Sequence, residues 1–251
     1  MVRRMPTVAV VQARIGSTRL PGKVLLPLGE SYVLDHVVRQ VRAADAVDEV
    51  VVATPDTEAD DVVTFYAERS GAATHRGPED DVLGRLFAAA DARDADTVVR
   101  VSADNPLMPP AYVEHAVSHL QANDLDYVTP AFDRQFPPGL ACEAMTLDSL
   151  RTVADRATTP DQREHVTVYY RDNSDAFDCA NLVPADVPGC ELVADRDDLR
   201  FTLDRAPDYE LVRRVYENVP FDDVLSLEEG VRYVDENGLT AINRDVRQRE
   251  V

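Results

Sequence analysis

The chain has 251 residues, of which 45% are apolar, so it is long enough for one large α/β domain with a sizeable core. Its formal net charge of −20 argues against duplex nucleic acid and anionic membranes as partners, since both require a basic surface. The apolar runs stay well short of the roughly 20 residues needed to span a bilayer.

Strand-like and helix-like segments alternate in the first half of the chain. Residues 7–12 form a short, β-branched run that is typical of a buried parallel strand, and a long loop over residues 13–25 follows it. Further short apolar runs predict strands at residues 49–53, 97–101 and 127–130. Amphipathic segments of helical length lie at residues 33–43, 59–69, 80–92 and 110–121. This alternation predicts a βαβ architecture with a largely parallel sheet.

The second half of the chain is less regular. We expect strands at residues 140–146, 177–182 and 199–203, and helices at residues 149–156, 162–173, 208–218 and 227–237. No internal repeat or low-complexity linker separates these segments. The pattern therefore predicts one domain over residues 1–251, with an irregular lobe at about 131–198 that covers the substrate.

Basic residues gather in the loop after the first strand. Arg14, Arg19 and Lys23 supply three cations, and Gly16 and Gly22 let the backbone approach a ligand closely. Lys23 is the only lysine of the chain, beside 25 arginines. A compact ammonium has therefore been kept at this point of an arginine-rich protein. Cations at the carboxyl edge of a parallel sheet are suited to binding a triphosphate.

The same loop does not match a Walker motif. Gly16 and Gly22 are separated by five residues where that motif has four, and Val24 stands where Ser or Thr would hold magnesium. A dinucleotide-binding G-x-G-x-x-G pattern is also absent from the sequence.

Two aspartates follow predicted strands. Asp104 comes after the strand at 97–101, and Pro106 prevents the chain from continuing there as strand or helix. Asp204 comes directly after the strand expected at 199–203. A carboxylate fixed at such a sheet edge can bind a hard cation. With 31 aspartates in the chain, an ordinary surface charge is the alternative interpretation for each.

Five stretches in this order resemble a known family. The sequence is similar to the cytidylyltransferases that activate 3-deoxy-octulosonate and acylneuraminate sugars, including the spore-coat polysaccharide F-type members. The stretches that carry the resemblance are residues 12–25, 76–83, 99–107, 163–167 and 201–204 with Asp208. The resemblance implies a three-layer, nucleotide-diphospho-sugar transferase-like (Rossmann-like) fold. It also implies a homodimer that uses Mg²⁺ to transfer CMP from CTP to a sugar acid, with release of pyrophosphate.

The resemblance also implies roles for individual residues. Arg14, Lys23 and Asp104 would be catalytic, and Asp104 and Asp204 would hold Mg²⁺. The residues that it places around the nucleotide are Ala13, Arg14, Gly16, Ser17, Arg19, Lys23, Arg76 and Arg100.

Several of these roles have alternatives. A solvated turn residue is the alternative for Arg76, and a strand-end ion pair is the alternative for Arg100. Glu143 would face the sugar, and His165 is expected to cap a helix or lie in the core. Arg205 departs from the small hydroxyl residue that usually follows the metal-binding aspartate.

Other functions remain open at this point. A nucleotidyltransferase that uses GTP or UTP is one alternative, and a nucleotide- or sugar-binding protein without turnover is another. Release of pyrophosphate would separate either enzyme from the binding protein. The sequence does not identify the sugar.

Composition also suggests a cellular setting. The three cysteines form no C-x-x-C pair, and we expect free thiols in a reducing cytoplasm. The dense carboxylate surface would repel itself at low ionic strength and be screened at molar salt, which predicts a halophilic, salt-rich habitat.

Overall fold

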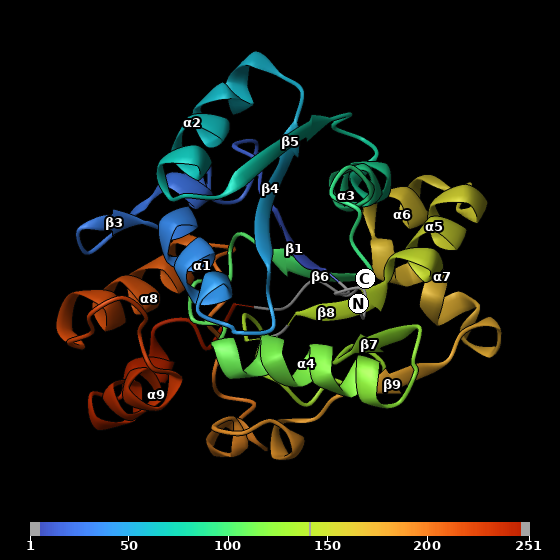
Figure 1. The fold of residues 1–251 in the computed structure, drawn as a ribbon. Helices are drawn as coiled ribbons and strands as arrows, with labels where there is room; N and C mark the ends of the chain where they lie inside the picture. The colour runs from blue at the N-terminus through green and yellow to red at the C-terminus, as the bar shows by residue number, and fades with distance from the viewer. Residues whose placement is uncertain (1–5, 141, 247–251) are drawn as a thin grey trace.

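A seven-stranded sheet forms the centre of the computed structural model, which describes residues 6–140 and 142–246 (Figure 1). The strands follow the order β5-β4-β1-β6-β8-β7-β9. Their bounds are β1 Thr7–Gln12, β4 Glu49–Pro55, β5 Ala73–Gly77, β6 Thr97–Ser102, β7 Tyr127–Thr129, β8 Glu143–Thr146 and β9 Cys179–Asn181. Strands β5, β4, β1 and β6 are parallel, whereas β8 runs antiparallel to β6 and β7. The sheet is therefore mixed and mostly parallel.

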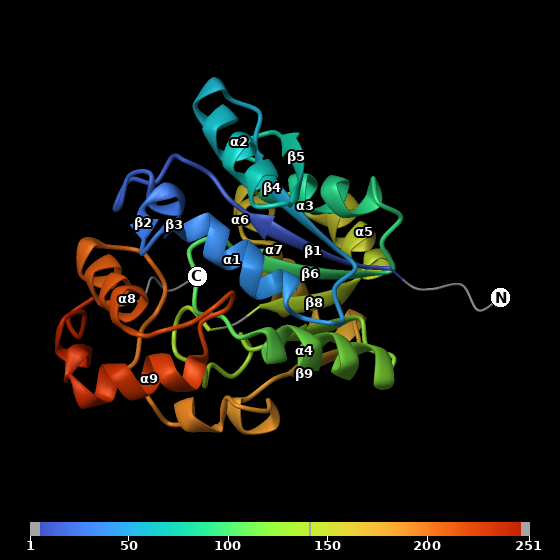
Figure 2. The ribbon, with the colours of Figure 1, turned by 60° about the vertical axis from the view of Figure 1, so that its left-hand side comes forward.

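Helices cover both faces of this sheet (Figures 1 and 2). Their bounds are α1 Val33–Arg42, α2 Asp61–Arg69, α3 Val82–Asp91, α4 Pro110–Ala122, α5 Leu147–Arg156, α6 Pro160–Glu164, α7 Val166–Asp172, α8 Ala206–Asn218 and α9 Leu227–Glu236. Apolar side chains of α1, α2, α4, α8 and α9 belong to one buried cluster. Those of α3, α5 and α7 belong to a second cluster on the opposite face. This arrangement confirms the predicted three-layer α/β fold.

Strand β1 shows why the sequence produces this sheet. Val8 and Val10 lie in the cluster with α3, whereas Ala9 and Val11 lie in the cluster with α1. Because successive side chains of a strand point to opposite faces, a strand between two helical layers is apolar at every position. In Figure 2 the arrow of β1 points towards the side where β2 (Pro27–Leu28), β3 (Ser31–Tyr32) and α8 lie.

Several predicted elements differ from the structure. Strand β5 has no signal in the sequence, because Thr74, His75 and Arg76 interrupt any apolar run and the strand is half-exposed at the sheet edge. The strand expected at 140–146 begins only at Glu143, and residue 141 lies outside the described residues. Strand β9 is likewise shorter than the expected 177–182.

Two predictions in the second half were wrong. Residues 199–203 do not form a strand. Their backbone is hydrogen-bonded to two loops instead: Phe201 N–H donates to the carbonyl of Pro138 at 2.7 Å, and Leu203 N–H donates to the carbonyl of Asp104 at 2.9 Å. The helix expected at 162–173 is broken at His165, whose φ of −112° and ψ of 86° are not helical, and it becomes α6 and α7. Residues 1–5 and 247–251 of the predicted domain lie outside the described residues. Throughout the described part of the chain, the helices are too short or too polar to cross a bilayer.

Candidate active site

The loop after β1 turns across the carboxyl end of the sheet. Ala13 N–H donates to the carbonyl of Ala53 at the end of β4, which extends the β1–β4 pairing by one bond. The carboxylate of the buried Asp60 then accepts a hydrogen bond from Ile15 N–H at 2.8 Å. Gly22 adopts a φ of +67°, a conformation that L side chains rarely adopt, immediately before the short 3-10 helix Lys23–Leu25. These contacts within the protein fix the backbone of the loop.

A cavity of about 480 Å³ opens beside this loop. This volume lies in the range of small-molecule and cofactor sites. Its walls come from the loop, from the end of β6, from Pro138 and Gly139, from the α6–α7 junction and from the segment before α8. The predicted site residues that line it are Ala13, Arg14, Gly16, Ser17, Arg19, Lys23, Asp104 and Asp204. The structure thus brings eight predicted residues from three distant segments to one cavity.

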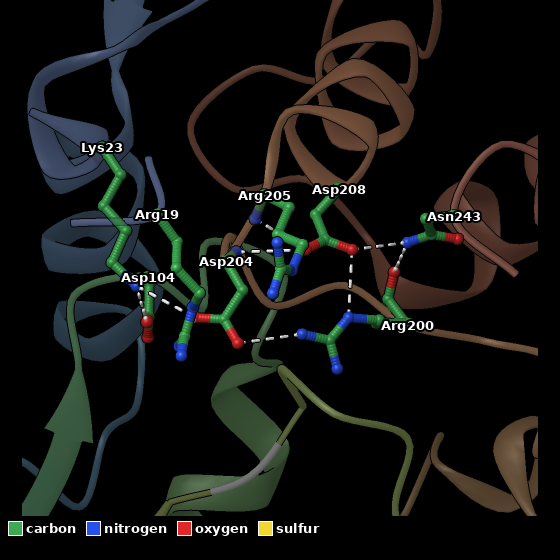
Figure 3. A network of polar contacts seen from close by, with 8 residues as sticks. All are labelled: Arg19, Lys23, Asp104, Arg200, Asp204, Arg205, Asp208 and Asn243. Carbon is green, nitrogen blue, oxygen red and sulfur yellow. Dashed lines mark hydrogen bonds and ion pairs between the residues drawn. The ribbon is translucent and has the colours of Figure 1, made fainter. Parts of the chain in front are cut away.

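Lys23 lies between the two predicted aspartates (Figure 3). Its Nζ is 2.5 Å from Oδ2 of Asp104 and 3.4 Å from Oδ1 of Asp204. Arg19 reaches the same Oδ1 of Asp204 through Nη2, at 2.9 Å. The side chains of Lys23, Asp104 and Asp204 are 16%, 20% and 14% exposed, so these charges are only partly hydrated. Carboxylates separated by 100 positions in the sequence therefore share one ammonium.

Asp204 is held in its charged form. Burial by itself would raise the pKa of its carboxyl, but the hydrogen bond from Arg19 and the charges of Lys23, Arg19 and Arg200 outweigh burial and lower the pKa below its ordinary value. An ionised carboxylate at neutral pH is the state that a metal ion requires.

The donor set of the cavity fits magnesium bound together with a nucleotide. Within the described residues, no group of three or more His, Cys, Asp or Glu side chains could hold a metal ion by itself. Mg²⁺ does not need such a cage, because it usually binds one or two carboxylates, phosphate oxygens of the substrate and water. Asp104 and Asp204 satisfy this requirement.

Arg14 contributes a cation that is largely available to a ligand. Its side chain is 49% exposed, and its carboxylate neighbour Glu79, at 4.0 Å, is 53% exposed. Such an exposed pair contributes little to stability. The guanidinium can therefore exchange this partner for a phosphate at small cost.

Arg76, Arg100 and Glu143 do not line the cavity. Arg76, on the edge strand β5, contacts Asp61 at 2.5 Å and the carbonyl of Thr57 at 2.7 Å. The hydrogen bond to Asp61 raises the pKa of Arg76. These contacts tie β5 to the segment after β4, so Arg76 is a strand residue in an ion pair and not the solvated turn residue of the alternative.

Arg100 and Glu143 neutralise each other within the sheet. Arg100 Nη1 lies 2.6 Å from Oε2 of Glu143, and Tyr127 donates its hydroxyl to Oε1 of Glu143 at 2.8 Å. Burial would lower the pKa of Arg100, but the charge of Glu143 raises it above its ordinary value. The contacts favour the ion-pair interpretation of Arg100 and leave Glu143 without direct access to the cavity.

Other cavity residues were not identified from the sequence. His165 caps α6 through its backbone N–H, which donates to the carbonyl of Asp161, in line with one of its expected roles, and it also lines the cavity. Gly139, with φ of +102°, also lines it, and a Cβ there would lie 2.2 Å from the backbone nitrogen of Thr202. The Pro-Pro-Gly sequence at 137–139 indicates a tight loop, but nothing in it indicates which segment the loop meets.

Comparisons with known proteins agree with this architecture. A family model described as cytidylyltransferase matches residues 8–229. The spore coat polysaccharide biosynthesis protein SpsF of Bacillus subtilis is 30% identical over 244 residues, which cover 94% of this chain and 97% of SpsF. A 3-deoxy-manno-octulosonate cytidylyltransferase of Geobacter metallireducens is 36% identical over 121 residues, 47% of this chain and 46% of that protein.

A solved structure extends the similarity to the whole fold. The structure of a cytidylyltransferase from Leptospira borgpetersenii superposes with a TM-score of 0.87 at 26% identity, covering 98% of this chain and 100% of that one. The family match spans the loop after β1, both aspartates and most of the sheet. The chain therefore belongs to the cytidylyltransferase family and is a nucleotidyltransferase.

Proposed function

We propose that this enzyme transfers CMP from CTP to a sugar acid of the 3-deoxy-2-keto or acylneuraminate type, with release of pyrophosphate, in the biosynthesis of a surface glycan. The observation that carries the proposal is the meeting of Lys23 and Arg19, from one loop, with Asp104 and Asp204 at one cavity. The names of the relatives support the choice of a sugar acid and a polysaccharide pathway.

The site residues suggest how the reaction is assisted. A hydroxyl of the sugar acid attacks the α-phosphorus of CTP and pyrophosphate leaves, so positioning and charge neutralisation are the main requirements. Arg14 and Lys23 hold the triphosphate and neutralise the charge that develops on pyrophosphate, while the backbone from Gly16 to Arg19 surrounds it. Asp104 and Asp204 would hold Mg²⁺, which would supply positive charge at the phosphate.

The charges of the site suggest how it would accommodate an anionic substrate and a cation. Lys23 neutralises Asp104 and Asp204, and Arg19 also pairs with Asp204. Asp104 and Asp204 would hold Mg²⁺ and the loop cations would pair with the triphosphate, so each charged side chain would keep a partner of opposite charge. This arrangement avoids the large cost of a buried, uncompensated charge. We further propose a cytoplasmic homodimer, as the family resemblance implies.

A pyrophosphate-release assay tests the proposal. Each of CTP, UTP, GTP and ATP is combined with a panel of 2-keto-3-deoxy and acylneuraminate sugar acids in the presence of Mg²⁺. The proposal expects release with CTP and at least one sugar acid, and none with CTP alone. Release with GTP or UTP but not CTP would contradict it, and so would binding of CTP without release across the whole panel.

A further inference from the structure

A fully buried carboxylate lies behind Asp204. Asp208, in the first turn of α8, is 0% exposed, and both of its oxygens accept hydrogen bonds. Its Oδ2 accepts from the backbone N–H groups of Asp204 at 3.1 Å and Arg205 at 2.9 Å. Asp208 thereby fixes the backbone on which the Asp204 side chain stands. The contact at residue 205 uses only the backbone N–H, and the side chain of Arg205 is exposed. An arginine in place of the small hydroxyl residue usual in the family is therefore compatible with this hydrogen bond.

Arg200 joins the two carboxylates (Figure 3). Its Nε lies 3.0 Å from Oδ1 of Asp208, and its Nη2 lies 3.0 Å from Oδ2 of Asp204. The guanidinium side chain is 7% exposed. Because a planar guanidinium binds in a fixed geometry, this bridge sets the orientation of the Asp204 carboxylate as well as its position. Arg200 holds Oδ2 of Asp204, and Oδ1 of Asp204 contacts Lys23 and Arg19.

Asn243 closes the network from the C-terminal segment. Its side chain is 2% exposed, and its Nδ2 donates to Oδ1 of Asp208 and to the carbonyl of Arg200, both at 3.0 Å. It therefore ties the side chain of Asp208 to the backbone of Arg200. Asn243 does not line the cavity, and it lies 39 positions beyond Asp204 in the sequence. Asn243 thus contacts Asp208, which fixes the backbone of Asp204, and the main chain of Arg200, whose guanidinium orients the Asp204 carboxylate.

We propose that Arg200, Asp208 and Asn243 are positioning residues that hold the Asp204 carboxylate in the orientation in which one oxygen binds the metal–nucleotide complex. The inference rests on the proposed function in one respect, namely that Asp204 is a ligand of Mg²⁺ when CTP is bound. Groups that orient metal ligands are commonly as important for metal affinity as the contacts they support. The network predicts such an effect at Asn243, which the family resemblance does not include among its site residues.

The test measures how strongly Mg²⁺ improves CTP binding. Isothermal titration calorimetry gives the Kd of CTP with saturating Mg²⁺ and with EDTA, for wild type, Asn243→Ala and Arg200→Lys. The ratio of the Kd of CTP in EDTA to the Kd with Mg²⁺ measures this effect. We expect Asn243→Ala to reduce that ratio by about 10-fold, in the range found for groups that orient metal ligands. The Kd in EDTA should stay within about twofold of wild type, because the loop cations are untouched. Arg200→Lys keeps the charge but not the planar bridge, so Mg²⁺ should also lower the Kd of CTP less in this variant than in wild type.

Matched variants separate positioning from stability. Asn237→Ala is the control, since Asn237 is exposed just after α9 and its side-chain Nδ2 donates to the carbonyl of Tyr233. It should leave the Mg²⁺ effect unchanged. In an Asp204→Asn background, Asn243→Ala should cause almost no further loss, because residues that act through one group are not additive. The Tm of every variant is measured so that binding is compared well below unfolding.

The outcomes distinguish the inference from the proposed function. If Asn243→Ala lowers the Tm but keeps the full Mg²⁺ effect, the network is only structural and the inference is wrong. It is also wrong if Mg²⁺ leaves CTP binding to the wild type unchanged. If the Mg²⁺ effect depends on Asn243 but no sugar acid yields pyrophosphate, the inference holds and the proposed acceptor is wrong. If CTP does not bind at all, binding of Mn²⁺ alone, followed by electron paramagnetic resonance, gives the same comparison between variants.

Discussion

Replacing Asp104 and Asp204 by asparagine, singly and together, tests the central feature of the site. Asparagine keeps the size of each side chain and removes its charge. Arg200 would remain paired with Asp208 at 3.0 Å, and Arg19, whose side chain is 37% exposed, would be solvated, so the Asp204→Asn variant should still fold. Loss of activity would then report on the site rather than on the fold.

The geometry sets the size of the expected effect. Both carboxylates contact the same ammonium and are at most 20% exposed, so water cannot replace either charge efficiently. Loss of one charged group that stabilises a transition state in such a site costs about 10²- to 10³-fold in rate, or about 3 to 4 kcal/mol. The double variant should lose little more than either single variant, because both groups serve one site.

The assay is pyrophosphate release against Mg²⁺ concentration at one fixed salt concentration. Wild type, both single variants and the double variant are compared with Asp222→Asn, which removes an exposed carboxylate outside the cavity. Each single variant should require more Mg²⁺, whereas the control should match wild type. Mg²⁺ dependence that stays unchanged in both single variants would refute a shared site. Additive losses in the double variant would show that the two aspartates act separately.

Three further predictions concern charge. Raising KCl from about 0.1 M to about 1 M should raise the Tm, because the Debye length falls from about 10 Å to about 3 Å and the carboxylates repel each other less; a flat or falling Tm would contradict the salt-rich habitat. Lys23→Ala should weaken CTP binding and slow pyrophosphate release while circular dichroism shows an intact fold, and Lys23→Arg should restore only part of the activity; full activity of Lys23→Ala at limiting CTP would refute the role of the loop. The pKa of Asp204 is lower in the folded protein than in the unfolded chain, where it is about 4. Its ion pairs therefore stabilise the protein above that pH, and this stabilisation is lost as the pH falls through the folded pKa. The Tm of Asp204→Asn should then fall less steeply below about pH 4 than the Tm of wild type. Parallel Tm curves for the two proteins would contradict this assignment.

The central sheet could be predicted because its strands are buried on both faces. Val8, Val10 and Val11 form a short β-branched run that suits a buried parallel strand better than a helix turn, and β4 and β6 follow the same rule. The edge strand β5 has no such signal, since it contacts one neighbouring strand and its side chains are half-exposed. Residues 199–203 gave the opposite error. There the sequence predicted a strand and none forms, because Phe201 and Leu203 are buried in a loop segment that does not join the sheet.

The site was predictable where its residues lie next to a strand or in one loop. Lys23 was singled out by composition and Asp104 by its place after β6, and the two are in contact. Asp204 was correctly placed at the cavity, although no strand ends there; the bond from Leu203 N–H to the carbonyl of Asp104 brings it close. Asn243 carried no signal, because the partner of a buried amide is decided by tertiary contacts alone.

The net charge and the site act on an anionic substrate in opposite directions. A net charge of −20 repels a triphosphate at low ionic strength, whereas Arg14, Arg19 and Lys23 attract it at one loop. Salt weakens the two effects unequally, because exposed charges are screened far more than partly buried ones. Lys23 is 16% exposed, so molar salt would screen its charge less than the exposed carboxylates that repel the substrate, whereas Arg14 and Arg19, at 49% and 37% exposed, would be screened more than Lys23. High salt should therefore increase the rate at which CTP associates, whereas in a protein with a basic surface it would decrease that rate.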